Sequence, residues 1–196
     1  MTRETSRGGR PRSSQAQEAI LHAVDDLLVE EGYAAMTMKS IATRAGVSRQ
    51  TLYRWWSTKA EILFEACVID AEQELTIPPQ PTPLADLTAF ISALVTFLAH
   101  SHAGAAYRAL MGETQHDPAV AELLAQRDVL SESARAVIHR VIDPMTAAAS
   151  VELAIALLVG PTYYWIISGR DPGLLDPEDL ARDGLRRLRA DARSSI

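Results

Sequence analysis

The sequence predicts an all-α protein of about nine helices, in which a small N-terminal helical unit precedes a larger C-terminal helical domain. Apolar residues recur at helical spacing along most of the 196 residues. No segment shows the alternation of a strand, and no internal repeat is found. Capping residues, glycines and prolines divide the helical segments from one another. Hydrophobic residues make up 47% of the chain, which is enough for a well-packed core.

The N-terminal part contains a basic arm and a series of short helices. Residues 1–13 are rich in Gly, Ser and Arg, and we expect them to be disordered. Thr37 and Ser48 are placed to cap helices, and Gly32 and Gly46 are placed to end them. The helices expected in this part run over about 14–31, 38–45, 49–55 and 59–75.

A proline cluster at 76–83 marks the domain junction, because each proline removes a backbone donor and restrains the residue before it. Pro83, Pro118 and Pro177 are placed to open further helices. The helices expected beyond the junction run over about 84–101, 103–115, 117–142, 146–169 and 177–193. The resulting domains are a disordered arm at 1–13, an N-terminal helical domain at 14–60 with a connecting helix at 59–75, and a C-terminal domain at 76–196.

Charge is distributed unevenly along the chain, whose formal net charge is −6. Residues 1–60 hold nine Lys or Arg and six Asp or Glu, a net charge of +3. The remaining residues hold ten and nineteen, a net charge of −9. This asymmetry indicates that a polyanion contacts the first third of the chain, while the rest faces solvent, protein or small molecules.

The composition favours a cytoplasmic protein. Cys67 is the single cysteine, so no internal disulfide can form and a reducing compartment is the simplest location. Met1–Ser14 is polar and arginine-rich and lacks the apolar core of an export signal. Val151–Ser168 is long and apolar enough to be weighed as a membrane span. Because Pro161 and a cluster of polar-tipped aromatic residues interrupt it, we expect a helix buried on two faces and no membrane contact.

The segment 37–59 carries the most informative pattern. Ile41 in the second expected helix, and Leu52 and Trp56 around the third, would form an apolar core. Gly46 would supply the left-handed turn between the two helices. Two short helices joined in this way predict a helix-turn-helix, whose second helix enters the major groove of DNA.

The same segment resembles the TetR family of transcriptional regulators (TetR/AcrR type). The family pattern I-A-x-x-A-G-V-S is present over Ile41–Ser48, and T-L-Y-x-x-F-x-x-K is present over Thr51–Lys59 with Trp56 in place of phenylalanine. The motif covers about 37–63, and the helix plan extends it loosely over the chain. The resemblance implies a homodimeric, ligand-responsive repressor that leaves a palindromic double-stranded DNA operator when a small effector binds the C-terminal domain.

Carried over position by position, the resemblance assigns groove contacts to Lys39 and the start of the third helix, and phosphate contacts to the residues that follow. Chemistry agrees, since Arg pairs with guanine, Gln pairs with adenine, and helix N-terminal amides bind phosphate. A solvated face for Arg49 and Gln50 and a structural role for Tyr53 are the alternatives. For the arm, a minor-groove contact and a solvated tail are equal alternatives. The DNA-binding candidates are Thr37, Lys39, Ser48, Arg49, Gln50, Thr51, Tyr53, Trp55 and Lys59.

The C-terminal domain is expected to enclose an effector pocket, because its helices carry more apolar and aromatic residues than one core needs. Pro161 would free the carbonyl of Leu157 and open room beside Tyr164 and Trp165. Such a pocket suits a neutral or anionic, partly aromatic or lipophilic effector. A purely structural role in the core is the alternative for each aromatic residue. The effector-binding candidates are Phe90, Phe97, His100, Tyr107, Met111, Arg127, Tyr164 and Trp165.

The last two helices are expected to form a dimer interface, as a four-helix bundle with those of a second copy. The helix over 146–169 is apolar nearly all round, so its own domain can cover only one face. The resemblance further implies that the helix beginning at Lys59 transmits effector binding to the DNA-binding domain. The interface candidates are Leu153, Leu157, Leu180, Leu185 and Leu188.

An enzyme and a constitutive DNA-binding structural protein are the other functions considered. Catalysis or metal binding needs converging side chains, and no group of them has a known ligand spacing. The acidic C-terminal part would be repelled by DNA and is larger than a dimerisation device requires. We therefore expect no enzymatic activity, no cofactor and no metal. The polar residues that could contribute to a catalytic or metal site are His100, His102, Glu113, His116 and Asp117.

Overall fold

The computed structural model describes residues 14–142 and 148–194, and the expected basic arm at 1–13 lies outside them. Within the described residues the chain forms ten α-helices, one short 3₁₀-helix and no strand. The contacts divide the chain into two compact units, residues 1–62 and 63–196. The predicted all-α class, with a helix-turn-helix followed by a larger helical domain, is confirmed.

The N-terminal unit is organised around α2, which packs on both α1 and α3. Gly32 has φ 76° within the span of α1, so the chain turns at the glycine predicted to end the first helix. Thr37 forms a capping box with Ser40 at the start of α2, and Ser48 caps α3, as predicted. The helices of this unit are α1 (Ser14–Ala35), α2 (Met38–Arg44), α3 (Arg49–Trp55) and the start of α4 (Lys59–Glu74).

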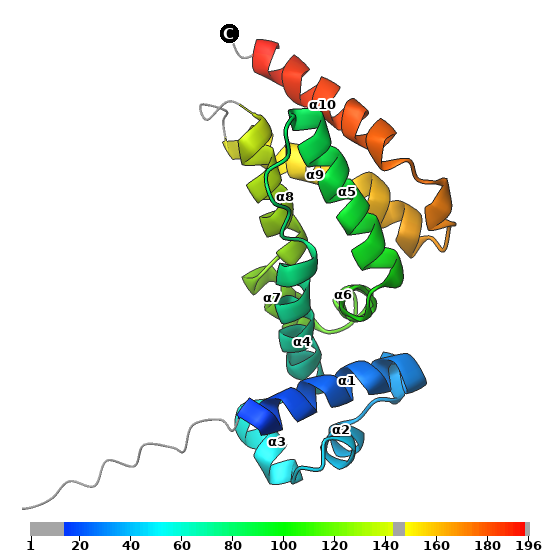
Figure 1. Cartoon of the computed structure of the whole chain (residues 1–196). Helices are drawn as coiled ribbons and strands as arrows, with labels where there is room; N and C mark the ends of the chain where they lie inside the picture. The colour runs from blue at the N-terminus through cyan, green and yellow to red at the C-terminus, as the bar shows by residue number, and fades with distance from the viewer. Residues whose placement is uncertain (1–13, 143–147, 195–196) are drawn as a thin grey trace, which may run out of the picture. The chain divides into compact units, whose positions relative to one another are not determined.

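The C-terminal unit is built around α5, which lies against α6, α8, α9 and α10 (Figure 1). Phe90, Leu94 and Phe97 of α5 are fully buried and form the centre of the core. The remaining helices are α5 (Pro83–His100), α6 (His102–Glu113), α7 (Pro118–Gln126), α8 (Val129–Val141), α9 (Ala148–Ile167), η1 (Pro172–Leu174) and α10 (Pro177–Ser194).

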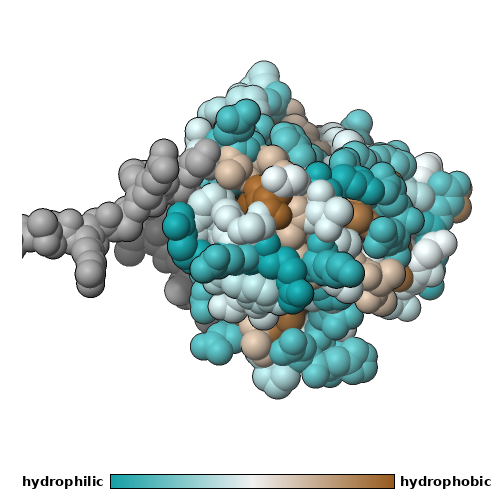
Figure 2. All heavy atoms as spheres, turned by 90° about the horizontal axis from the view of Figure 1, so that it is seen from below, coloured by the Kyte–Doolittle hydropathy of each residue, from teal (hydrophilic) through white to brown (hydrophobic). Residues whose placement is uncertain are grey.

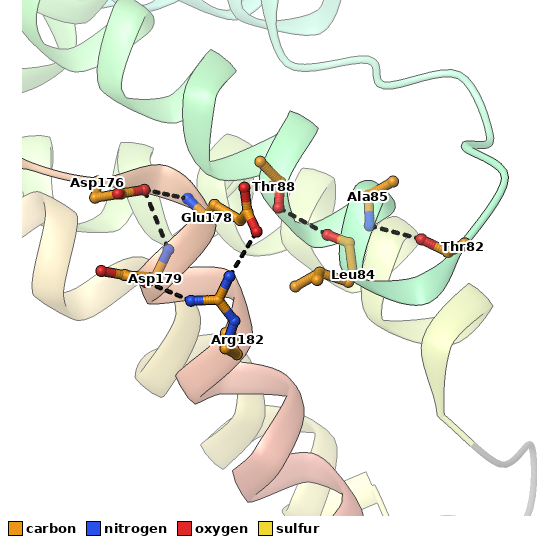
Figure 3. Close-up of polar contacts among 8 residues, drawn as sticks. All are labelled: Thr82, Leu84, Ala85, Thr88, Asp176, Glu178, Asp179 and Arg182. Atoms are coloured by element: carbon orange, nitrogen blue, oxygen red, sulfur yellow. Dashed lines mark hydrogen bonds and ion pairs between the residues drawn. The ribbon is translucent and has the colours of Figure 1, made fainter.

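N-terminal caps fix the starts of α5 and α10 (Figure 3). The Thr82 hydroxyl accepts a hydrogen bond from the Ala85 amide at 3.1 Å. The Asp176 carboxylate accepts two from the first turn of α10, at 2.9 and 3.2 Å. Pro83 and Pro177 occupy the first position of each helix, where no amide donor is needed. The proline start signals predicted for these two helices are confirmed.

The prediction of a single helix over 117–142 is wrong. The segment forms two helices, α7 and α8, which are separated at Arg127 and Asp128. Asp128 caps α8 by accepting the Ser131 amide at 3.1 Å. In an unbroken helix, the apolar stripe of Val120 and Leu124 would continue at residue 127. Because that residue is Arg127, the apolar stripe is interrupted where the helix breaks. The break adds a helix to the expected nine and places a carboxylate at the start of α8.

One described helix, α5, is long and apolar enough to span a membrane by composition. Seven of its residues are buried within the C-terminal unit, including the charged Asp86, so α5 is the core helix of that unit. The apolar segment at 151–168 lies mostly in α9, which packs against α5, α8 and α10. The face drawn in Figure 2 is mostly hydrophilic with small, separate hydrophobic areas, which are normal on folded proteins.

Candidate DNA-binding surface and ligand cavity

A small apolar core holds α2 and α3 together. Ile41 and Leu52 are fully buried, and Trp56 is 4% exposed. Gly46 lies between the two helices with φ 66°, a conformation that strains any residue with a Cβ. The helix-turn-helix predicted from these positions is therefore present in the N-terminal unit.

The start of α3 presents polar side chains beyond a fixed cap. The Ser48 Oγ accepts the Thr51 amide at 3.0 Å and lies 2.9 Å from the Thr51 hydroxyl. Arg49 and Gln50 are exposed, and Tyr53 is 50% exposed. The Arg49 guanidinium lies 5.8 Å from the centre of the Tyr53 ring, so the two side chains share one side of the helix. A guanidinium and an amide at this position can hydrogen-bond to base edges.

The remaining candidates on α2 and α3 differ in exposure. Thr37 and Lys39 are exposed at the start of α2. Trp55 is half-buried and meets Trp56 edge-on, with ring centres 5.6 Å apart. Arg54, which the sequence analysis did not single out, lies 5.7 Å from the centre of the Trp55 ring. It adds an exposed cation to the C-terminal end of α3.

Lys59 has partners inside the N-terminal unit. Its Nζ donates hydrogen bonds to the carbonyl oxygens of Tyr33 and Met36, at 2.6 and 3.0 Å. It also lies 4.1 Å from the centre of the Tyr33 ring. The ammonium group thus ties the first residue of α4 to the corner between α1 and α2. This geometry supports a structural role for Lys59, and its phosphate contact stays a prediction.

Arg44 joins α2 to α1. Its guanidinium pairs with the Glu30 carboxylate and lies 3.4 Å from that of Asp26. The hydrogen bond from Arg44 holds the pKa of Glu30 below its ordinary value. The sequence analysis counted Arg44 only as a positive charge. The i, i+4 spacing of Asp26 and Glu30 on one face of α1 could have indicated this ion pair.

An open cavity of about 390 Å³ lies in the C-terminal unit, between α6, α7 and the start of α8. This volume falls in the range of ligand pockets, roughly 300–1,000 Å³. Two of the predicted effector residues, Tyr107 and Met111, line it. The lining residues are Tyr107, Met111, Thr114, Ala121, Leu124, Ala125 and Asp128.

Tyr107 connects this cavity to the core. The residue is 9% exposed, and its ring centre lies 6.3 Å from that of Phe97 and 6.4 Å from that of Tyr163. Burial, followed by the nearby charge of Asp128, raises the pKa of the Tyr107 hydroxyl well above its ordinary value. The cavity therefore presents a neutral phenol close to a carboxylate.

Several other predicted effector residues lie elsewhere. Phe90 and Phe97 are fully buried in the core around α5, which fits the structural alternative for these two rings. His100 is exposed at the end of α5. Arg127 precedes the cap of α8 and pairs with two glutamates, Glu72 of α4 and Glu132 of α8.

Tyr164 and Trp165 lie against a cation rather than an opening. The Arg170 guanidinium is 5.2 Å from the centre of the Tyr164 ring and 4.8 Å from that of Trp165. The Trp165 indole donates a hydrogen bond to the carbonyl of Asp171 at 2.8 Å. α9 remains helical through Pro161. Arg170 therefore lies beside both rings, and neither ring lines the cavity that contains Tyr107.

Arg108 of α6 was also missed by the sequence analysis. One of its guanidinium nitrogens is buried and has no hydrogen-bond partner among the described residues. Burial lowers the pKa of this group. Within residues 14–142 and 148–194, no group of three or more His, Cys, Asp or Glu is placed to hold a metal ion.

The predicted interface residues have different surroundings. Leu153 is 55% exposed, whereas Leu185 is 9% exposed because α10 packs on α5 and α9. Leu157, Leu180 and Leu188 are half-buried. A small hollow between α9 and α10 is lined by Ala154, Leu157, Leu158, Gly184, Arg187 and Leu188.

Two family models match the chain. The model described as bacterial regulatory proteins of the tetR family matches residues 20–66, and the tetracyclin repressor-like C-terminal domain matches residues 77–183. The HTH-type transcriptional regulator YdeS of Bacillus subtilis (strain 168) is 30% identical over 190 residues, which cover 94% of this chain and 96% of that protein.

Solved structures have the same fold. The crystal structure of the TetR family transcription regulator SCO0332 is 26% identical, with a TM-score of 0.67, and the match covers 88% of this chain and 97% of that one. Salmonella enterica GusR is 19% identical with a TM-score of 0.64, over 93% of this chain and 98% of that one. With the helix-turn-helix formed by α2 and α3, these matches show that the chain belongs to the TetR family of bacterial DNA-binding transcriptional regulators.

Proposed function

We propose that the protein is a ligand-responsive repressor, whose dimer binds a palindromic DNA operator and leaves it when a small effector binds the C-terminal unit. The exposed start of α3 carries this proposal, because Arg49 and Gln50 follow a fixed N-cap there. The net positive charge of residues 1–60 supports attraction to phosphate. We assign base contacts to Arg49 and Gln50, and phosphate contacts to Tyr53 and the amides after Ser48. The repressor would act in the cytoplasm and needs no cofactor.

An exposed apolar stripe on α9 supports the dimer. Leu153, Leu157, Gly160, Tyr164 and Ile167 follow one another at alternating intervals of four and three residues, which is the spacing of a helix-packing seam. Leu153, Tyr164 and Ile167 are 55%, 59% and 49% exposed, respectively. We propose that this stripe and α10 face a second copy of the chain. A monodisperse monomer at micromolar concentration in sedimentation would contradict the dimer.

The cavity beside Tyr107 supports an effector response. α4 begins in the N-terminal unit and ends in the C-terminal unit, so one continuous helix belongs to both. Within the C-terminal unit the Cys67 thiol of α4 donates to the carbonyl of Ala103 in α6, at 3.3 Å. α6 also supplies cavity residues, which makes it a route from the cavity to α4. The effector must bind more tightly to the conformer that does not fit the operator, since equal affinity for both shifts nothing.

Gel-shift titrations with DNA from upstream of the protein's own gene, and with a scrambled sequence, test the proposal. We expect Arg49→Ala to cost about 1–3 kcal/mol on the operator and to relax preference at one base pair. Arg135→Ala is the matched control, since it removes a partly exposed arginine of α8 that pairs with Glu152 and lies outside the proposed DNA-binding and dimer surfaces. Equal binding of operator and scrambled DNA, or equal effects of the two variants, would contradict the assignment.

A further inference from the structure

We propose that the cavity between α6, α7 and α8 binds a small lipophilic cation, which the Asp128 carboxylate and the Tyr107 ring recognise together. The inference rests on the proposed effector response and names the chemical class of the effector. It replaces the neutral or anionic effector that the sequence alone suggested.

The cavity wall is apolar apart from three oxygen-bearing side chains. Alanine, leucine and methionine side chains supply aliphatic and thioether surface. Tyr107 adds an aromatic ring, and Thr114 adds a hydroxyl. Among the described residues, no Lys, Arg or His lines the cavity. An aromatic ring attracts a cation placed over its face, so this wall suits a ligand with an apolar body and one positive charge.

Asp128 keeps acceptor capacity for such a ligand. One carboxylate oxygen accepts the Ser131 amide at 3.1 Å, and the other accepts the Ser131 hydroxyl at 2.6 Å. A carboxylate offers about four acceptor sites, so both oxygens can accept a further hydrogen bond or ionic contact. The two bonds to Ser131 hold the carboxylate in a fixed orientation at the cavity wall.

Charges around Asp128 favour a cation over an anion. Arg127 pairs with two glutamates of α4 and α8, and Arg135 pairs with Glu152 of α9. These three glutamates and Asp128 make four carboxylates, whereas the two arginines supply only two positive charges and already have carboxylate partners. Arg108, whose buried nitrogen has no hydrogen-bond partner among the described residues, is not among the lining residues. An anion would meet a local excess of negative charge, whereas a cation is attracted by it.

The test uses the full chain and two ions of the same shape and opposite charge, tetraphenylphosphonium and tetraphenylborate. In isothermal titration calorimetry we expect the cation to bind. We expect the anion to bind at least roughly tenfold more weakly than the cation. Asp128→Asn removes the charge and keeps the cap, because Asn caps helices as well as Asp. We expect it to weaken tetraphenylphosphonium binding by roughly tenfold. Asp117→Asn is the matched control, since Asp117 caps α7 by accepting the Ala119 amide at 2.9 Å and does not line the cavity.

A second variant keeps the test independent of the cap. Ala121→Lys places a cation at the cavity wall, and we expect it to abolish tetraphenylphosphonium binding and to strengthen tetraphenylborate binding. Equal affinity of wild type for the two ions, or equal losses in Asp128→Asn and Asp117→Asn, would overturn the proposal. Unchanged cation binding by Ala121→Lys would also overturn it.

A gel shift with operator DNA, run in parallel, tests the cation site and the proposed switch separately. Tetraphenylphosphonium binding that depends on Asp128, without operator release, supports the cation site and contradicts the proposed switch. Operator release by other compounds, with no tetraphenylphosphonium binding, overturns the cation site and leaves the proposed switch intact.

Discussion

Replacing Lys59 by methionine removes its ammonium group and keeps most of its aliphatic stem. The ammonium donates two hydrogen bonds to backbone carbonyls and lies over the Tyr33 ring. A hydrogen bond with one charged partner contributes about 1.5–3 kcal/mol, and an exposed cation–π contact about 0.5–1 kcal/mol. Because Lys59 is only half-buried, we take the lower part of these ranges. Two such hydrogen bonds and one cation–π contact then give about 3.5–4.5 kcal/mol, which is the loss of unfolding free energy that we expect for Lys59→Met.

Urea unfolding at pH 7 measures this change, with Lys39→Met as the control. Lys39 is exposed on α2, so its replacement should change stability by less than about 0.5 kcal/mol. The salt dependence of operator binding separates the two roles of Lys59. A lost phosphate contact makes the negative slope of log K against log salt shallower by about 0.9, whereas a structural role leaves the slope unchanged. Wild-type stability of Lys59→Met, combined with a shallower slope, would refute the structural role.

Three further predictions concern the packing of each unit. Gly104→Ala places a Cβ 1.7 Å from a carbonyl oxygen of α5 and should lower the melting temperature strongly, whereas Gly112→Ala meets no atom within 4 Å and should leave it unchanged or higher. Asp86→Asn removes the only carboxylate that pairs with Arg140 among the described residues, and should cost about 2–4 kcal/mol of unfolding free energy. Additive losses in a double-mutant cycle with Arg140→Met would contradict this coupling. Because the pKa of Glu30 is lowered, its ion pair with Arg44 stabilises the fold at pH values above the ordinary carboxyl pKa of 4.5. The loss of unfolding free energy caused by Glu30→Gln should therefore be present at pH 7 and vanish as the pH falls through the lowered pKa. An equal loss of stability in acid would rule out the ion pair as its cause.

Local chemistry made the N-terminal unit predictable from sequence. Thr37 and Ser48 cap helices because their hydroxyls reach the amide three residues ahead, a property of the short segment alone. Gly46 adopts a positive φ for an equally local reason. Burial of Ile41 and Leu52 follows from helical spacing once these helix bounds are known.

Contacts between distant segments were not predictable in the same way. Lys59 reaches a carbonyl 26 residues earlier, and Arg140 reaches Asp86 across 54 residues. No local pattern specifies such partners. An effector pocket was predicted, but its position was not, because the cavity forms where a predicted continuous helix breaks before Asp128. The surplus of aromatic residues suggested both Tyr107, which lines the cavity, and Phe90, which fills the core, and it could not separate the two.

Through the apolar stripe on α9, the proposed dimer would link the lifetime of each subunit to the amount of protein present. If a second copy covers Leu153 and Ile167, folding and association become one equilibrium, and the melting temperature rises with protein concentration. At a few molecules per cell, a larger share of chains would be single, with the stripe open to water and to proteases. Synthesis rate would then influence both how many subunits are made and how long each one survives.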